Sequence, residues 1–146
     1  DAVEAVGERL GDPDFEVTSI HVNPAAETVV VDARGLEGPD SLDGFTVHRG
    51  RIRSVAPKRV SVSDDLDEEA FSVSEVHLDR LDEMVEQAHE GFASEGSWVE
   101  YVSIRAEPTE DRTRKEPVVR VQLESDRSAA EARFSADGRL LELELR

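Results

Sequence analysis

The stretch "FSADGRLLELELR" at residues 134–146 has a diverged copy earlier in the chain, "FTVHRGRIRSVAP" at residues 45–57. In both, a strand-like run leads into a tight turn at glycine, and a second strand-like run follows. Asp137-Gly138 is a strong hairpin signal, because glycine accepts the positive φ angle that such turns need. Two copies of one hairpin predict an internal duplication. Alternation along the last run predicts one apolar face, made by Leu141, Leu143 and Leu145.

The sequence before each hairpin supports the duplication. Before the first copy, "DAVEAVGERLG" has apolar residues at helical spacing, and the strand-like runs "FEVTSIHV" and "ETVVVDA" flank the breaker "NPAA". Before the second copy, the helix-like "VHLDRLDEMVEQAHEGF" precedes the strand-like runs "SWVEYVSIRA" and "PVVRVQLES". Each unit is therefore predicted to be a helix followed by four strands. The apolar stripe predicted for the second helix is Leu78, Leu81, Val85, Ala88 and Phe92.

The two units also align by residue. "SIHV" at residues 19–22 aligns with "SIRA" at residues 103–106, at a spacing of 84 residues. Val31 aligns with Val121 at a spacing of 90. In the hairpins the glycines match at a spacing of 88, whereas Phe45 and Phe134 match at 89. A slip of one residue reverses the faces of a strand, so both alignments of the hairpins stay open.

These patterns predict an α+β fold, in which two tandem α-β-β-β-β repeats form an antiparallel sheet of about eight strands with the helices packed on one face. We place the first repeat at residues 1–62, an acidic linker at 63–75 and the second repeat at 76–146, together in one compact domain. The acidic centre of the linker is expected to be exposed, and "RVSV" at residues 59–62 could pair as an edge strand. An open sheet leaves two edges that could pair, so the oligomeric state stays undetermined.

Composition restricts the partners and the location. The chain has 34 acidic and 17 basic residues, a formal charge of −17, which argues against nucleic acid because phosphates would be repelled. There is no cysteine, hence no disulfide and no thiolate metal site. Because the first residue is Asp1, we expect an upstream segment such as a signal peptide, a lipid anchor or a membrane helix. The acidity itself fits a halophile, a basic partner or simple solubility.

Catalytic motifs are missing from the chain. It has neither a G-x-S-x-G elbow nor a glycine-rich phosphate loop. Glu86 and His89 could supply half of a metal site, but a ligand set needs three or four convergent groups, and a solvated helix face is the alternative. The run "DDLDEE" at residues 64–69 lacks the central glycine of a calcium loop, which favours a solvated linker. We predict no catalytic residue, no metal and no cofactor.

A basic patch on the first hairpin is one candidate for binding a partner. Residues 44–63 contain no acidic residue, and Arg49, Arg51 and Arg53 lie close together there. The patch could bind an anionic partner or a lipid surface. Alternatively, its cations protect an edge strand from aggregation.

The first strand of the second repeat is another candidate. Val102 and Ile104 are expected to face the helix, which leaves Val99, Tyr101 and Arg105 on the other face. Exposed aromatic and arginine side chains are favoured anchors at protein interfaces, whereas ordinary surface residues are the alternative. The candidate contact residues on this strand are Trp98, Tyr101 and Arg105.

A helix followed by four antiparallel strands, duplicated within one small chain, resembles the β-lactamase inhibitory proteins and, more loosely, the PepSY-like domains. The turn in "DGRLLELEL" is similar to the end of a PepSY-type unit. "VEYVSIRAEP" followed by "PVVRVQL" resembles two-repeat lipoproteins of unknown function from actinobacteria. The chain departs from the inhibitory proteins in having no cysteine and few aromatic residues, so the resemblance implies a binding role and not a β-lactamase target.

Two functions remain in competition. The first is a non-enzymatic binding module of the cell envelope, extracytoplasmic, with a protein or a cell-envelope component as its partner. The second is an acidic cytoplasmic inhibitor or immunity protein that neutralises a basic partner through the strongly negative second helix and linker. An enzyme is the least favoured class, because no set of catalytic groups is recognisable.

Overall fold

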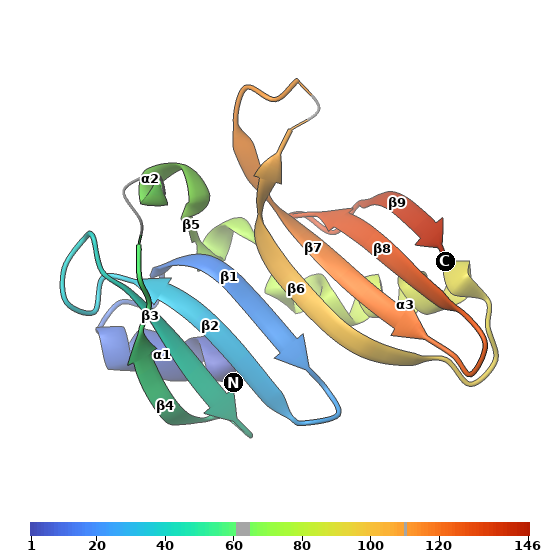
Figure 1. Ribbon diagram of the computed structural model, residues 1–146, viewed down its shortest axis with the longest axis horizontal. Helices are drawn as coiled ribbons and strands as arrows, with labels where there is room; N and C mark the ends of the chain where they lie inside the picture. The colour runs from blue at the N-terminus through green and yellow to red at the C-terminus, as the bar shows by residue number, and fades with distance from the viewer. Residues whose placement is uncertain (61–64, 110) are drawn as a thin grey trace.

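The computed structural model describes residues 1–60, 65–109 and 111–146, and it confirms the predicted α+β fold (Figure 1). The first unit consists of α1 (Ala2–Leu10), β1 (Glu16–Asn23), β2 (Thr28–Arg34), β3 (Leu42–His48) and β4 (Arg51–Pro57). The second consists of α3 (Leu81–Phe92), β6 (Trp98–Pro108), β7 (Lys115–Glu124), β8 (Ala129–Ser135) and β9 (Leu140–Leu145). Between them lie α2 (Leu66–Glu69), β5 (Phe71–Ser72) and the 3-10 turns η1 (Val73–Glu75) and η2 (Leu78–Arg80).

All the strands belong to one antiparallel sheet. Eight of them follow the order β4-β3-β2-β1-β6-β7-β8-β9, and β5 pairs with β1 beside this path. Helices α1 and α3 lie on the same side of the sheet, behind it in Figure 1. The other side carries no helix formed by the described residues, and it is called the open face below.

The two repeats are joined by the pairing of their first strands, β1 and β6. Ile20 faces Ile104 across this antiparallel pair, and the sequence alignment at a spacing of 84 makes the same two residues equivalent. Equivalent residues that face each other in antiparallel strands define a local two-fold relation between the repeats. We call this β1–β6 pairing the seam. It consists of four residue pairs in the middle of the sheet.

Strand pairing corrects the alignment of the second strands. Ile20 pairs with Val31, and Ile104 pairs with Val119. Val31 is therefore equivalent to Val119, at a spacing of 88 residues, and its predicted match with Val121 is wrong. The phenylalanines of the two hairpins face these two valines, which confirms their match at a spacing of 89.

A β-bulge between β8 and β9 changes the predicted face of the last strand. Phe134 pairs with Leu140 and Ala132 with Leu143, so that Leu140 and Leu143 pack against the core. Leu141 is 42% exposed. The predicted apolar face of the three leucines is therefore wrong at Leu141, because the bulge inserts a residue and reverses the face.

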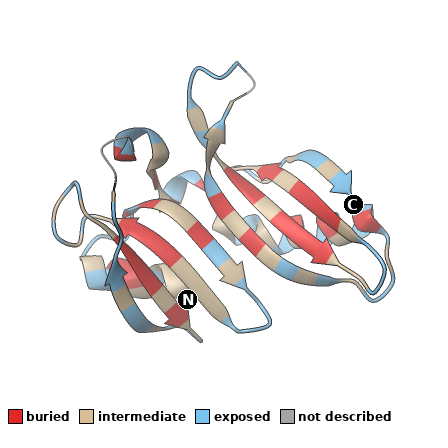
Figure 2. Cartoon of the chain, in the orientation of Figure 1, coloured by how far each residue is buried: buried red, intermediate tan, exposed pale blue. Residues whose placement is uncertain are grey.

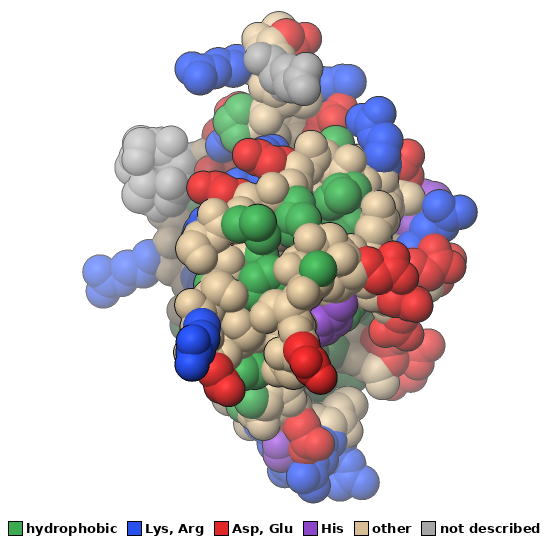
Figure 3. Space-filling model, turned by 90° about the vertical axis from the view of Figure 1, so that its right-hand side faces the viewer, with side chains coloured by type: hydrophobic (Ala, Val, Ile, Leu, Met, Phe, Trp, Pro, Cys, Tyr) green, Lys and Arg blue, Asp and Glu red, His purple; other side chains and the backbone are tan. Residues whose placement is uncertain are grey.

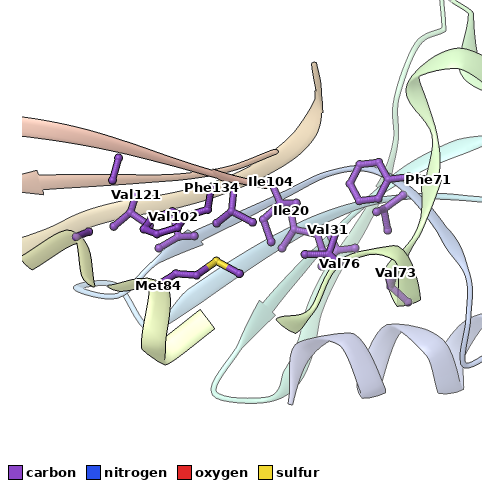
Figure 4. Packing of buried hydrophobic residues seen from close by; sticks show 14 of the residues in the cluster. Ile20, Val31, Phe71, Val73, Val76, Met84, Val102, Ile104, Val121 and Phe134 are labelled. Atoms are coloured by element: carbon purple, nitrogen blue, oxygen red, sulfur yellow. The ribbon is translucent and has the colours of Figure 1, made fainter. Parts of the chain in front are cut away.

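One hydrophobic core lies between the sheet and the helices (Figures 2 and 4). Phe45 and Phe134 are fully buried in it, one from each repeat. Helix α3 contributes Met84, Ala88 and Phe92. The predicted helix started too early, because Leu78 lies in the 3-10 turn η2 and α3 begins at Leu81. All five residues of the predicted stripe pack in or against the core, but the stripe omitted the buried Met84. No helix within the described ranges is long and apolar enough to cross a membrane.

The segment between the repeats packs into the molecule. Leu66, Phe71, Val73 and Val76 are buried, and β5 pairs with β1. The predicted exposure of the acidic centre holds for Asp65, Asp67 and Glu68, whereas Glu69 is half-buried. The buried apolar side chains around it were not predicted, and their burial stabilises the connection. Of the suggested edge strand at residues 59–62, residues 59–60 are not in a strand, and 61–62 lie outside the described residues, as do 63–64 of the linker.

Ion pairs tie this connecting segment to both repeats. Asp67 of α2 accepts from Arg34 Nη2 of β2 at 2.7 Å, and Glu69 contacts Lys115 Nζ of β7 at 3.4 Å. The Asp67 carboxylate raises the pKa of Arg34. Two carboxylates of the acidic run "DDLDEE", those of Asp67 and Glu69, therefore have ion-pair partners. The first residue of the run, Asp64, lies outside the described residues.

Truncation of a buried residue in the middle of the seam should destabilise the folded chain strongly. Ile104 is fully buried, so Ile104→Ala should lower the free energy of unfolding by about 2–5 kcal/mol, through lost burial and the cavity left behind. Leu145→Ala is the matched control, because Leu145 is 66% exposed and should cost less than about 0.5 kcal/mol. Urea denaturation measures both. Equal effects of the two substitutions would contradict this account of the seam.

Candidate binding surface on the open face

The middle of the open face is formed by residues of the seam strands. His21 of β1 and Tyr101 of β6 are stacked, with ring centroids 5.2 Å apart and an interplanar angle of 26°. Ser19 pairs with Arg105, and His21 pairs with Ser103, so all these side chains leave the sheet on the same side. His21 and Arg105 are exposed. An aromatic stack beside an exposed guanidinium is a combination that favours binding of a partner.

A β-bulge in β6 brings Trp98 to the same face. Val99 pairs with Leu123 and Tyr101 pairs with Gln122, with the irregularity between them. Val99 therefore packs against the core, and its predicted place beside Tyr101 is wrong. Trp98 is 43% exposed, and its Nε1 donates to Glu100 Oε2 at 3.3 Å.

A network of charged side chains covers the open face of the second repeat. Arg120 of β7 donates through Nε and Nη2 to both carboxylate oxygens of Glu107, at 2.7 and 2.6 Å, and also pairs with Glu131. Glu131 is buried and receives a second contact from Arg146 Nη2 at 3.3 Å. The bidentate contact with Arg120 lowers the pKa of Glu107, and it raises that of Arg120. Such paired geometry holds the side chains in fixed positions.

The first repeat has a smaller network at the corresponding place. Asp32 of β2 accepts from Ser19 Oγ at 2.9 Å and from Lys58 Nζ at 2.9 Å. Lys58 lies over Gly44, where an added Cβ would be 3.2 Å from Lys58 Cε and 3.2 Å from Asp32 Oδ1. The absence of a side chain at Gly44 leaves the room that the lysine needs to reach Asp32.

A broad hollow of about 1130 Å³ opens beside these charges. It lies between the β6–β7 hairpin, which projects beyond the rest of the sheet in Figure 1, and the turn between β8 and β9. Its lining combines arginines and acidic residues with apolar ones, and includes Arg114, Arg133, Arg139, Glu107 and Leu141. At the hairpin tip, hydrogen bonds from Thr109 and Thr113 lower the pKa of Asp111 to about 2.

The structure divides the six predicted contact residues between two places. Trp98, Tyr101 and Arg105 lie together on β6, near the middle of the sheet, as described above. The basic patch lies on and beside β4 at the edge of the sheet, with three strands between β4 and β6. Arg49 is paired with Glu27, while Arg51 and Arg53 are exposed. The six residues therefore do not form one continuous surface.

Several residues of this face could not be predicted from a local sequence pattern. Arg120, Glu107 and Glu131 are far apart along the chain and meet only because β6, β7 and β8 pair in a particular register. His21 offered one indirect signal, because the alignment at a spacing of 84 placed it over Arg105. Equivalent positions on the first strands of a two-fold arrangement are expected to lie close to each other.

The metal candidates do not converge on a site in the part of the chain that the structure describes. His89 Nδ1 is 2.8 Å from Ser97 Oγ, and Glu86 is exposed on the outer side of α3. No group of three or more potential metal ligands occurs within residues 1–60, 65–109 and 111–146.

The Arg120 network predicts a pH-dependent contribution to stability. The folded state depresses the pKa of Glu107 below its ordinary value of 4.5, so the stabilisation is complete above that pH and is lost as the pH falls through the folded value. Glu107→Gln should lower the free energy of unfolding by about 1–3 kcal/mol at pH 7. The difference from the unaltered chain should shrink as the pH falls below the ordinary pKa of the carboxyl group and through its lowered folded value. Denaturant titrations at several pH values measure it, and a difference that is constant with pH would contradict the network.

Comparisons with known proteins concern the fold. No protein-family model matches the chain, and no curated protein matches it. A crystal structure of a protein described as a "putative lipoprotein" from Clostridium difficile 630 is similar, with a TM-score of 0.61 and 11% sequence identity. The similarity covers 100% of this chain and 91% of that chain. The overall fold is therefore similar to that of a protein with a very different sequence.

Proposed function

We propose that this chain is a non-enzymatic binding module of the cell envelope, located outside the cytoplasm, and that its contact surface is the middle of the open face. The single observation that carries the proposal is the cluster of His21, Trp98, Tyr101 and Arg105 on the open face, which no helix covers in the part of the chain that the structure describes. Aromatic and arginine side chains with a rigid backing dominate the binding energy of many interfaces.

Two further observations support this role. The paired side chains around Arg120 and Asp32 hold the surroundings of the cluster in place, which reduces the ordering cost of binding. The fold is similar to that of a "putative lipoprotein", and the tandem α-β4 arrangement resembles the PepSY-like and β-lactamase inhibitory folds, which act by binding. The partner is a protein or another component of the envelope.

A second candidate is the cytoplasmic inhibitor of a basic protein. It is favoured by the outer side of α3, where Asp82, Glu83, Glu86 and Glu90 are exposed. Among the ion pairs of the described residues, none includes any of these four carboxylates. A strongly negative surface of this kind would attract a basic partner.

Site-specific photocrosslinking in the native host separates the two candidates. A photoreactive phenylalanine analogue at Tyr101 should capture a partner in the envelope fraction, and the same analogue at Glu86 should capture none. Adding Trp98→Ala and Arg105→Ala should reduce capture at position 101 by tenfold or more, because two anchors are lost. A basic cytoplasmic partner captured at position 86 alone would support the inhibitor and contradict the envelope module.

A further inference from the structure

The two edge strands of the sheet, β4 and β9, occupy the same place in the two repeats but carry different side chains. Each is the last strand of its repeat and lies at an end of the strand order. Within the described residues, no strand pairs with the outer edge of either one. Their backbone groups on that side are free to pair with another strand.

The edge formed by β4 is basic on the open face and apolar on the side of the helices. Arg51 pairs with His48 and Arg53 lies at the bulge that follows, and both arginines are exposed. Neither takes part in an ion pair among the described residues. Ile52 and Val55 pack against the core and are only partly buried.

The edge formed by β9 is acidic on the open face and, like β4, apolar on the side of the helices. In the register of the two strands, Glu142 is opposite Arg133 of β8 and Glu144 is opposite Glu131. Residues directly opposite each other point to the same side of a sheet, so both glutamates lie on the open face. Leu143 packs against the core, and Leu145 is 66% exposed. Figure 3 views the molecule from the side of β9 and shows hydrophobic side chains gathered at the surface there, with acidic ones beside them.

We propose that β9 of one copy of this chain pairs with β4 of a second copy and so continues the sheet from molecule to molecule. Neighbouring strands alternate in direction through the whole sheet, so β9 and the β4 of the next copy are antiparallel when the sheets run on. Arginines then meet glutamates on the open face, and Ile52 and Val55 meet leucines on the other.

The seam supports this mode of association. Inside the chain, the first strands of the two repeats already pair antiparallel over four residue pairs. The proposed contact joins their last strands in the same way. Pairing of two β9 edges would instead bring glutamates together, and pairing of two β4 edges would bring arginines together, so charge selects the mixed contact. Such a contact joins different surfaces and produces open-ended chains of molecules.

Charge reversal provides a reciprocal test. Sedimentation velocity should show that the 146-residue chain forms larger species as its concentration rises. Arg51→Glu/Arg53→Glu gives two acidic edges, and Glu142→Arg/Glu144→Arg gives two basic edges, so each variant alone should associate about tenfold more weakly or worse. An equal mixture of the two variants should associate again, because each acidic edge then finds a basic one.

Matched controls carry the same changes of net charge away from the edges. Arg112→Glu/Arg114→Glu on the β6–β7 hairpin and Glu86→Arg/Glu90→Arg on α3 should associate like the unaltered chain. Circular dichroism confirms that every variant is folded before it is used. A chain that stays monomeric at all concentrations would overturn the proposal. So would a mixture of edge variants that does not associate, or control variants that dissociate like the edge variants.

Discussion

The pairing of Ile20 with Ile104 at the seam is the contact on which the rest of the structure depends. One helix-and-four-strand repeat can cover only one side of a small sheet and leaves the edge of its first strand unpaired. Pairing the two first strands covers the free edges of β1 and β6 at once, and it connects the two halves of the core. It also brings side chains of β1 and β6 together at the middle of the open face, where the His21–Tyr101 stack lies.

Within this shared frame the two repeats have diverged in charge. The spacing of 88 residues that relates Val31 to Val119 also relates Asp32 to Arg120. Asp32 is held by a serine and a lysine, whereas Arg120 is held by two glutamates. The same position therefore carries opposite charges in the two repeats, and each charge has acquired its own partners. The last strands differ in the same sense, with arginines on β4 and glutamates on β9.

The sequence predicted the features that depend on local pattern. Helical spacing identified α1 and α3. The Asp137-Gly138 turn and the repeated hairpin predicted the succession of strands along the chain. The two errors of strand face arose at β-bulges, because one extra residue moves Val99 and Leu141 to the opposite face without changing the alternation in the sequence. Ion pairs such as Arg120–Glu107 were not predictable either, since they depend on the register between strands. Of the predicted contact residues, Tyr101 and Arg105 were placed correctly on the open face, where their role is a proposal.

Solution NMR tests the seam most directly, through cross-strand contacts and the exchange of backbone amides with solvent. The structure predicts nuclear Overhauser effects between residues 19–22 and residues 102–105 in the register that sets Ile20 opposite Ile104. It also predicts that hydrogen-bonded amides of β1 and β6 exchange as slowly as those of β7, because all three strands are interior to the sheet. Absence of these contacts, together with rapid exchange along β1 and β6, would mean that the two repeats fold as separate halves and would contradict the account.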